Sequence, residues 1–183
     1  MDLELKGKVA IIGGASKGLG RACADVLAEE GAKIMMCSRT KADLDQAAEE
    51  IRDATGAEVL TYAGDLESYD TIKDLISTTV SQFGQLDIMV NNSGGPPLAR
   101  SFTATEEQWE TAVQRSLFFF ARMSREAVPH LKAQGGGRII NILASTVYQP
   151  IPNLALSGAT RLGVVAFAKS LADEVGRDGI LVN

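Results

Sequence analysis

Thiols and imidazoles, the groups that form disulfides and most structural zinc sites, are scarce in this sequence. There are 2 cysteines and 1 histidine in 183 residues. Cys23 and Cys37 lie outside any Cys-x-x-Cys or Cys/His cluster, so neither a disulfide scaffold nor a zinc site is expected. No apolar run approaches the roughly 18 residues of a membrane-spanning helix. The start, Met-Asp-Leu-Glu-Leu-Lys, has neither the basic nor the apolar region of a signal peptide.

An excess of basic residues is also absent. Lys and Arg number 18 against 23 Asp and Glu, for a net charge of −5, and they form no basic block. Binding to nucleic acid or to a membrane surface depends on clustered positive charge, so neither partner is expected. The length suits one domain with a full hydrophobic core. The composition therefore predicts a single soluble, cytoplasmic domain over residues 1–183.

The sequence does contain short apolar runs that alternate with longer amphipathic stretches, a pattern typical of βαβ units on a parallel sheet. Strands are expected at 8–12, 33–37, 58–62, 87–90, 138–143 and 180–182. Helices are expected at 18–30, 41–53, 68–83 and 156–175, and one long helix should run from the capping-box pattern Thr105-Glu-Glu-Gln108 to about residue 132. Right-handed crossovers would place helices on both faces, which predicts a doubly wound α/β sheet of the Rossmann type. The sixth strand ends the sequence at Asn183, which indicates an incomplete chain or one completed by another segment.

A glycine-rich segment follows the first strand and opens the first helix. Its residues are Gly14, Ala15, Ser16, Lys17, Gly18, Leu19 and Gly20. Glycines there permit a tight turn and let backbone N–H groups approach a pyrophosphate, to which the helix N-terminus adds partial positive charge. The alternative is an ordinary strand-to-helix turn that binds nothing. The position after a first strand favours phosphate binding.

The spacing Gly-x-x-x-Gly-x-Gly resembles the short-chain dehydrogenase/reductase family, which usually has Thr where this sequence has Gly13. The resemblance extends to Trp109 and to residues 137–142, 168–172 and 180–183. It also assigns two motifs to the cofactor, namely Asp65-Leu66 at the adenine and Asn92-Ser93-Gly94 after the fourth strand. It implies an NAD(P)-dependent oxidoreductase that moves a hydride between nicotinamide and a carbonyl or alcohol carbon. The family normally continues past this Asn183 into a substrate-binding lobe.

The end of the second strand bears on which dinucleotide is used. NAD-selective proteins usually carry an acid there that hydrogen-bonds the ribose 2′-OH. Here the strand ends Cys37-Ser38-Arg39, and the next acid is Asp43. Arg39 can form a charge-assisted bond to a 2′-phosphate, and Lys17 can reach the same group, unless both are merely solvated surface charges. The pattern, like the family resemblance, favours NADP(H) over NAD(H).

Four catalytic positions implied by the resemblance all depart from the family pattern. The family's Tyr and Lys fall at Ser157 and Arg161, its Asn at Ser116, and its Ser at Ala144 beside Ser145. Ser145 would orient the substrate oxygen or serve only a loop role, and Arg161 would hold the nicotinamide ribose. The proton would come from Tyr148, Ser157 or a bound water, since Arg does not exchange protons near neutral pH. Tyr148 has an alternative role in packing on the loop prolines.

Two functional hypotheses follow. The first is an NADP(H)-dependent oxidoreductase with non-standard catalytic residues, acting on a small carbonyl or alcohol and similar to 3-oxoacyl reductases. The second is a catalytically silent dinucleotide-binding scaffold or redox-sensing partner protein. The resemblance also implies a homo-oligomer, a dimer or tetramer, built by the helix that carries residues 117–120 and the helix at 156–175.

Overall fold

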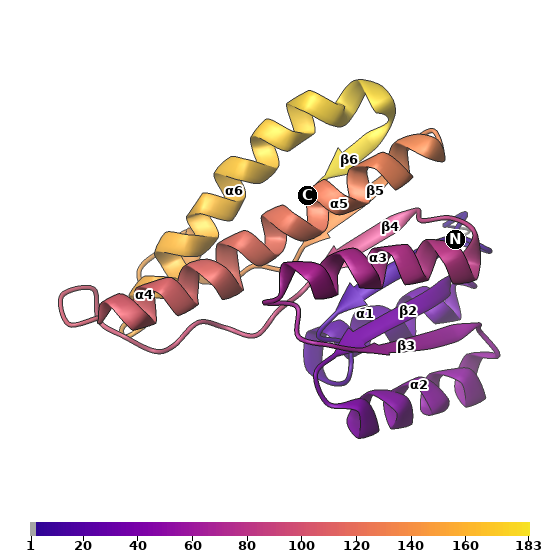
Figure 1. Ribbon diagram of the computed structural model, residues 1–183, viewed down its shortest axis with the longest axis horizontal. Helices are drawn as coiled ribbons and strands as arrows, with labels where there is room; N and C mark the ends of the chain where they lie inside the picture. The colour runs from indigo at the N-terminus through magenta and orange to yellow at the C-terminus, as the bar shows by residue number, and fades with distance from the viewer. Residues whose placement is uncertain (1–2) are drawn as a thin grey trace.

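Six parallel strands form the centre of this computed structural model, which describes residues 3–183 (Figure 1). Their order across the sheet is β3-β2-β1-β4-β5-β6. The strands are β1 (Val9–Gly13), β2 (Lys33–Ser38), β3 (Val59–Ala63), β4 (Ile88–Asn91), β5 (Gly137–Asn141) and β6 (Ile180–Val182). The doubly wound sheet expected from the sequence is confirmed, with strand ends that differ from the expected ones by at most two residues.

Helices cover both faces of the sheet, so two hydrophobic cores form. The helices are α1 (Gly18–Glu29), α2 (Lys41–Thr55), α3 (Tyr69–Phe83), α4 (Glu106–Val113), α5 (Phe119–Ala133) and α6 (Ala155–Val175). In β1, Ile12 belongs to the core that includes residues of α1 and α2, whereas Ile11 belongs to the core that includes residues of α3, α5 and α6. A strand buried on both faces must be apolar at every position, which explains why β1 reads as an unbroken apolar run.

The long fourth helix of the sequence prediction is interrupted. Its start is as expected, because the Gln108 backbone N–H donates to Thr105 Oγ1 at 3.2 Å and the Gln108 side chain accepts from the Thr105 N–H at 3.0 Å. Between α4 and α5, however, the short π-helical segment η1 (Gln114–Phe118) replaces α-helical geometry. A π-helical segment of this kind inserts one extra residue into the helical repeat, and such segments often mark functional sites. No residue type marks a π segment in a sequence, so the pattern predicts one uninterrupted helix.

The carboxyl ends of all the strands lie along one edge of the sheet because every pairing is parallel. β1 pairs with both β2 and β4, and the chain leaves β1 and β4 in opposite directions across the sheet. Loops that diverge in this way leave a crevice between them, which is where open α/β sheets bind ligands. At the opposite edge, the buried Asp87 carboxylate accepts hydrogen bonds from Lys8 Nζ at 3.0 Å and the Val9 N–H at 2.9 Å, and so ties β1 to the start of β4.

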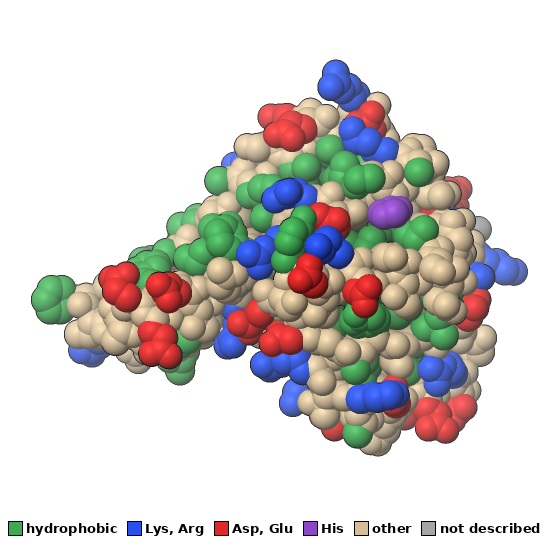
Figure 2. Space-filling view, in the orientation of Figure 1, with side chains coloured by type: hydrophobic (Ala, Val, Ile, Leu, Met, Phe, Trp, Pro, Cys, Tyr) green, Lys and Arg blue, Asp and Glu red, His purple; other side chains and the backbone are tan. Residues whose placement is uncertain are grey.

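The chain before α4 extends away from the sheet. Figure 1 shows this loop and α4 at the left of the view, and Figure 2 shows hydrophobic atoms at its tip. The backbone N–H of Ala99 donates to Asn153 O at 2.8 Å, so the loop is attached to the segment that precedes α6. No helix within residues 3–183 is long and apolar enough to cross a bilayer. The same residues contain no group of three or more His, Cys, Asp or Glu side chains arranged to hold a metal.

Candidate functional site

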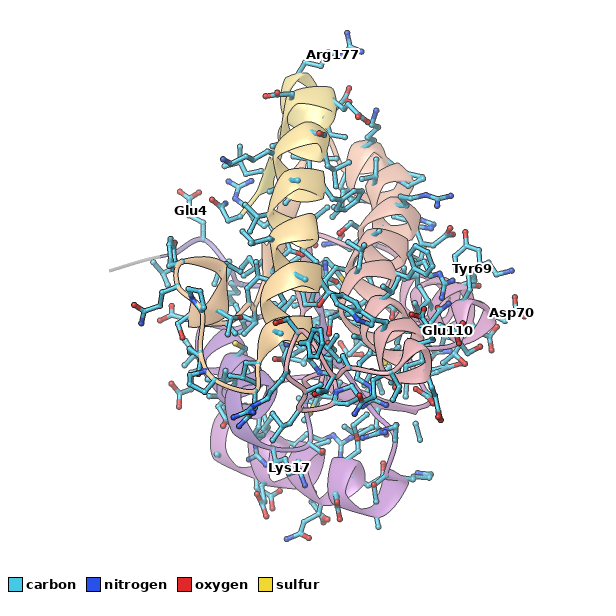
Figure 3. All side chains as sticks on the ribbon, turned by 90° about the vertical axis from the view of Figure 1, so that its left-hand side faces the viewer. Glu4, Lys17, Tyr69, Asp70, Glu110 and Arg177 are labelled. Atoms are coloured by element: carbon cyan, nitrogen blue, oxygen red, sulfur yellow. The ribbon has the colours of Figure 1, made fainter. Side chains whose placement is uncertain are left out.

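A cavity of about 430 Å³ lies at the carboxyl edge of the sheet, beside the ends of β1 to β4. Many of the residues that the sequence predicts at a cofactor line it together, although they come from four separate loops: Gly14, Ser16, Lys17, Ser38, Arg39, Asp65, Leu66, Asn92, Ser93 and Gly94. Figure 3 looks onto the side of the molecule that carries Lys17, which lies at the opposite end of the view from Arg177 after α6. The crevice position follows from the parallel topology.

Some predicted cofactor residues do not line this cavity. Ala15 is fully buried beneath it, and Leu19 points outward with 65% of its surface exposed. Gly18 begins α1 with a left-handed φ of +62°, and Gly20 is buried in the first turn of the same helix. Arg161 is buried in α6, outside the cavity wall.

The lining also includes residues that sequence reasoning did not assign, namely Thr40, Asp43, Gly64, Glu67, Gly95, Arg115 and Phe119. Most of these residues are next to a predicted residue in the sequence. Their position just after a strand could therefore have identified them as cavity residues. Arg115 and Phe119 come instead from η1 and the start of α5, and no motif marks them. Arg115 Nε lies 2.7 Å from Glu67 Oε1, so this ion pair joins the η1 segment to the loop after β3.

The glycine loop is packed tightly against the loop after β4. The Asn92 side chain donates from Nδ2 to Gly13 O at 3.1 Å. A Cβ on Gly13 would lie 2.6 Å from Asn92 O, and a Cβ on Gly20 would lie 2.4 Å from Gly14 O. Gly14 itself has a φ of +59°, which L side chains rarely adopt. These positions therefore require glycine for reasons of space and of backbone conformation.

The residues around the cavity fit a ligand that carries phosphates. Lys17 is the N-cap of α1 but makes no side-chain cap hydrogen bond, so the first-turn N–H groups have no side-chain acceptor there. Because glycines in the glycine loop carry no side chains, a phosphate group can approach the loop backbone closely. Among residues 3–183, neither Lys17 nor Arg39 takes part in an ion pair, and both are exposed at the cavity. Two free cations and a helix N-terminus make this region suitable for anions.

The thiol nearest the cavity is chemically inert. Burial and the nearby Asp65 charge raise the pKa of Cys37 to about 12. Its carbonyl accepts a hydrogen bond from the Ala15 N–H at 3.0 Å, which ties the glycine loop to the end of β2. Because the thiolate is the reactive form of cysteine, Cys37 acts as a small apolar residue at neutral pH.

The predicted catalytic residues divide into an exposed pair and a buried pair. Ser145 begins the 3₁₀ turn η2 (Ser145–Val147) and is exposed, and Tyr148 follows that turn with 91% of its surface exposed. Tyr148 lines a second cavity of about 830 Å³, formed by residues 100–102 and 146–155 and one side of α6. Ser157 and Arg161 are buried in α6 and line neither cavity. The structure therefore does not bring Tyr148 to the cavity that the cofactor residues line.

The buried residues have few partners. Ser157 Oγ lies 3.3 Å from Thr146 Oγ1. Arg161 Nη1 donates to Ile142 O at 3.1 Å, and burial lowers the pKa of Arg161 from its ordinary value. The Ser116 hydroxyl is fully buried in η1 and has no hydrogen-bond partner among the described residues. Buried polar atoms without partners are rare in folded proteins.

Comparisons with known proteins agree with this geometry. A family model described as short chain dehydrogenase matches residues 8–183. The chain is 32% identical over 181 residues to dehydrogenase/reductase SDR family member 4 of Caenorhabditis elegans, covering 98% of this chain and 70% of that protein. It is also 32% identical over 181 residues to a 3-oxoacyl-acyl-carrier-protein reductase of Vibrio cholerae, covering 99% of this chain and 72% of that protein.

Among solved structures, L-sorbose reductase from Gluconobacter frateurii complexed with NADPH and L-sorbose superposes with a TM-score of 0.96 at 34% identity. The alignment covers 100% of this chain and 70% of that one. Carveol dehydrogenase from Mycobacterium avium in complex with NAD gives a TM-score of 0.92 at 29% identity, covering 97% of this chain and 69% of that one.

The close packing of the start of α1 on the glycine loop can be tested with Gly20→Ala. A Cβ at 2.4 Å from a backbone oxygen forces the loop to shift, so the free energy of unfolding should fall by about 1–3 kcal/mol. Urea denaturation measures this change. Gly176→Ala is the matched control, because its φ is −58° and a Cβ there meets nothing within 4 Å. Equal stability of the two variants would contradict the close approach.

Proposed function

The chain belongs to the short-chain dehydrogenase family, and on that premise we propose that it is an NADP(H)-dependent oxidoreductase acting on a small carbonyl or alcohol of the 3-oxoacyl kind. The observation that carries the proposal is the cavity at the carboxyl edge, in which the glycine loop, Asp65 and Asn92 lie together. The similarity to a 3-oxoacyl-acyl-carrier-protein reductase supports the substrate class. When bound, the nicotinamide dinucleotide would supply or accept the hydride.

The loops around the cavity would hold different parts of the cofactor. The glycine loop would bind the pyrophosphate through its backbone and the start of α1. Asp65 and Leu66 would contact the adenine, and residues 92–94 would lie toward the nicotinamide. Ser38, Arg39 and Lys17 would bind the 2′-phosphate that distinguishes NADP from NAD. In support, Arg39 and Lys17 face the same cavity and have no ion-pair partner in residues 3–183, and L-sorbose reductase was solved with NADPH.

We expect Arg39→Ala to weaken NADPH binding by about 10-fold or more and to leave NADH binding unchanged. A charge-assisted hydrogen bond to phosphate is worth about 1.5–3 kcal/mol, and NADH offers no 2′-phosphate. Fluorescence titration with each cofactor measures both affinities. Arg177→Ala is the matched control, since this exposed arginine lies after α6 at the far end of the molecule from Lys17 (Figure 3).

The opposite cofactor preference would contradict the assignment of Arg39. Asp43 also lines the cavity and would then be the acid that accepts a hydrogen bond from the ribose 2′-OH.

In the proposed reaction, carbonyl reduction places the hydride on the carbonyl carbon and a proton on its oxygen. Ser145 is exposed at the start of η2, after β5, and lines neither cavity, and its hydroxyl would orient a substrate oxygen there. Ser157 is held by Thr146, and an aliphatic hydroxyl is a weak acid. We therefore propose that a bound water, oriented by these hydroxyls, delivers the proton, because Tyr148 lies on the second cavity.

NADPH consumption with short 3-oxo esters tests the activity. Tyr148→Phe should retain turnover within about 2-fold, whereas loss of a general acid costs roughly 10²–10⁴-fold. Ser145→Ala should lower kcat by about 10-fold while NADPH still binds. A large loss in Tyr148→Phe would instead identify the phenol as the proton donor.

A catalytically silent scaffold is the second candidate function. The observation that favours it is that Ser157, Arg161 and Ser116 are all buried, and none of them is an acid or base suited to neutral pH. Tight NADPH binding with no turnover of any carbonyl tested would support this alternative over the enzyme.

The protein would form a homo-oligomer through the surface that carries the loop before α4, η1 and α6. Leu98, Phe102, Phe118 and Leu162 are 70%, 97%, 40% and 50% exposed, respectively. In Figure 2, hydrophobic atoms extend from the protruding tip along the upper edge of the extension. Large apolar side chains gathered in this way are typical of protein interfaces.

We expect the protein to sediment as a dimer or tetramer and Leu162→Asp to raise the dimer dissociation constant by about 100-fold, because a charge would be buried at the interface. Val26→Asp is the control, since Val26 is 55% exposed on α1, a helix of the other face. Sedimentation velocity over a concentration series measures both. A monomer at every concentration would contradict the proposed oligomer.

A further inference from the structure

Glu67, in the loop between β3 and α3, is held by arginines from two other elements. Arg115 Nε, in η1, lies 2.7 Å from Glu67 Oε1. Arg122 Nη1, in α5, donates to the carbonyl of Glu67 at 3.2 Å. The guanidinium carbon of Arg122 also lies 5.0 Å from the centroid of the Phe118 ring and 5.5 Å from that of Tyr69. The loop after β3 is therefore attached to η1 and α5.

The same loop fixes the side chain of Asp65. The Glu67 N–H donates to Asp65 Oδ1 at 3.0 Å. The Ser68 N–H donates to the carbonyl of Asp65 at 3.1 Å, which closes a tight turn. Because Arg115 holds Glu67 and Glu67 holds Asp65, the position of the Asp65 carboxylate depends on a residue of η1.

Arg115 also contacts the loop after β4. The Ser93 hydroxyl donates to the carbonyl of Arg115 at 3.2 Å. The side chain of Arg115 thus reaches one loop and its backbone reaches another. Asp65, Glu67, Ser93 and Arg115 all line the cavity of about 430 Å³. Arg115 therefore joins two of the loops that form the cavity, and its ion pair with Glu67 lies at the cavity wall.

The cationic side chains at this cavity differ in how their charge is balanced. Lys17 and Arg39 form no ion pair within residues 3–183, whereas Glu67 offsets the charge of Arg115. Free cations suit phosphate groups. A paired guanidinium suits a neutral aromatic ring, because its flat face stacks on the ring while its edge keeps the ion pair. The side chain of Arg115 is 30% exposed, so part of it is open to a ligand.

We propose that Arg115 is a cofactor-binding residue, whose guanidinium packs flat against the adenine while Glu67 holds it in place. The inference rests on the proposed function and deepens it, since Asp65 and Leu66, which would contact the adenine, directly precede Glu67. The cavity has room for the base, because small-molecule sites span about 300–1,000 Å³ and this one measures about 430 Å³. Glu67 is a positioning residue, which acts through its hydrogen bonds to Arg115 and Asp65.

Adenosine 5′-monophosphate (AMP) and ribose 5-phosphate form a matched pair of probes, because only AMP carries the adenine. Calorimetric titration of the full chain measures both affinities. Arg115→Met should weaken AMP binding by about 10-fold, because the base loses its contact with the guanidinium. The affinity for ribose 5-phosphate, which has no base, should stay unchanged. Arg125→Met is the matched control, since Arg125 is an exposed arginine of α5 that does not line the cavity.

Two further variants separate contact with the base from anchoring of the loop. Arg115→Lys keeps a positive charge opposite Glu67 but has no flat group, so AMP affinity should fall nearly as far as in Arg115→Met. It also serves as the test if Arg115→Met does not fold. Arg122→Met removes the other side-chain bond to Glu67 but no part of the cavity wall, so the preference for AMP over ribose 5-phosphate should remain.

The unliganded Arg115→Met variant should melt within about 4 °C of the parent, because a partly exposed ion pair contributes little stability. Thermal unfolding without ligand measures this difference. A much larger drop would assign Arg115 to stability of the fold and overturn its role as a binding residue.

The outcomes separate this inference from the proposed function. Equal AMP affinity in the parent and Arg115→Met overturns the adenine contact, whether or not the protein turns over NADPH. Full AMP affinity in Arg115→Lys, or an equal loss in Arg122→Met, would assign the effect to charge or to the loop anchor and would overturn it as well. An AMP preference that depends on Arg115, without NADPH turnover on any carbonyl tested, would support the contact and overturn the oxidoreductase.

Discussion

The contact between the chain after β1 and the chain after β4 is the constraint on which the site depends. Parallel pairing places β1 beside β4, and the Asn92 side chain then reaches the Gly13 carbonyl. The space left over is too small for any Cβ at Gly13 or Gly20. Because these backbones touch, the start of α1 lies beside the residues after β4, and the cavity has a common floor built from two distant parts of the sequence.

Electrostatics divide the region around this floor into two parts. In the cavity, Lys17 and Arg39 are exposed and unpaired among the described residues, so an anion can approach them at little desolvation cost. Deeper, Arg161 has lost most of its hydration and keeps a single carbonyl as hydrogen-bond partner. An unpaired exposed cation is ordinary, whereas an unpaired buried one costs stability that an anionic ligand can restore.

Much of the fold could be predicted from the sequence because its signals are local. Apolar runs such as residues 9–12 must be strands covered on both faces, and Thr105 with Gln108 forms its capping box within four residues. The η1 segment could not be predicted, since no residue type or capping pattern in Gln114–Phe118 distinguishes a π segment from the α-helix around it. Arg115 and Phe119 reach the cavity from that segment, and for the same reason no motif identified them.

The sequence by itself determined that the chain is an alternating α/β protein with a glycine loop after its first strand, because both follow from residue types at short spacing. Only the tertiary structure decided that Tyr148 lies on the second cavity, that Ser116 has no partner and that Arg161 has no counter-ion. These properties depend on which distant residues pack around each group. The presence or absence of a partner is a property of the folded neighbourhood, which residue type and spacing do not specify.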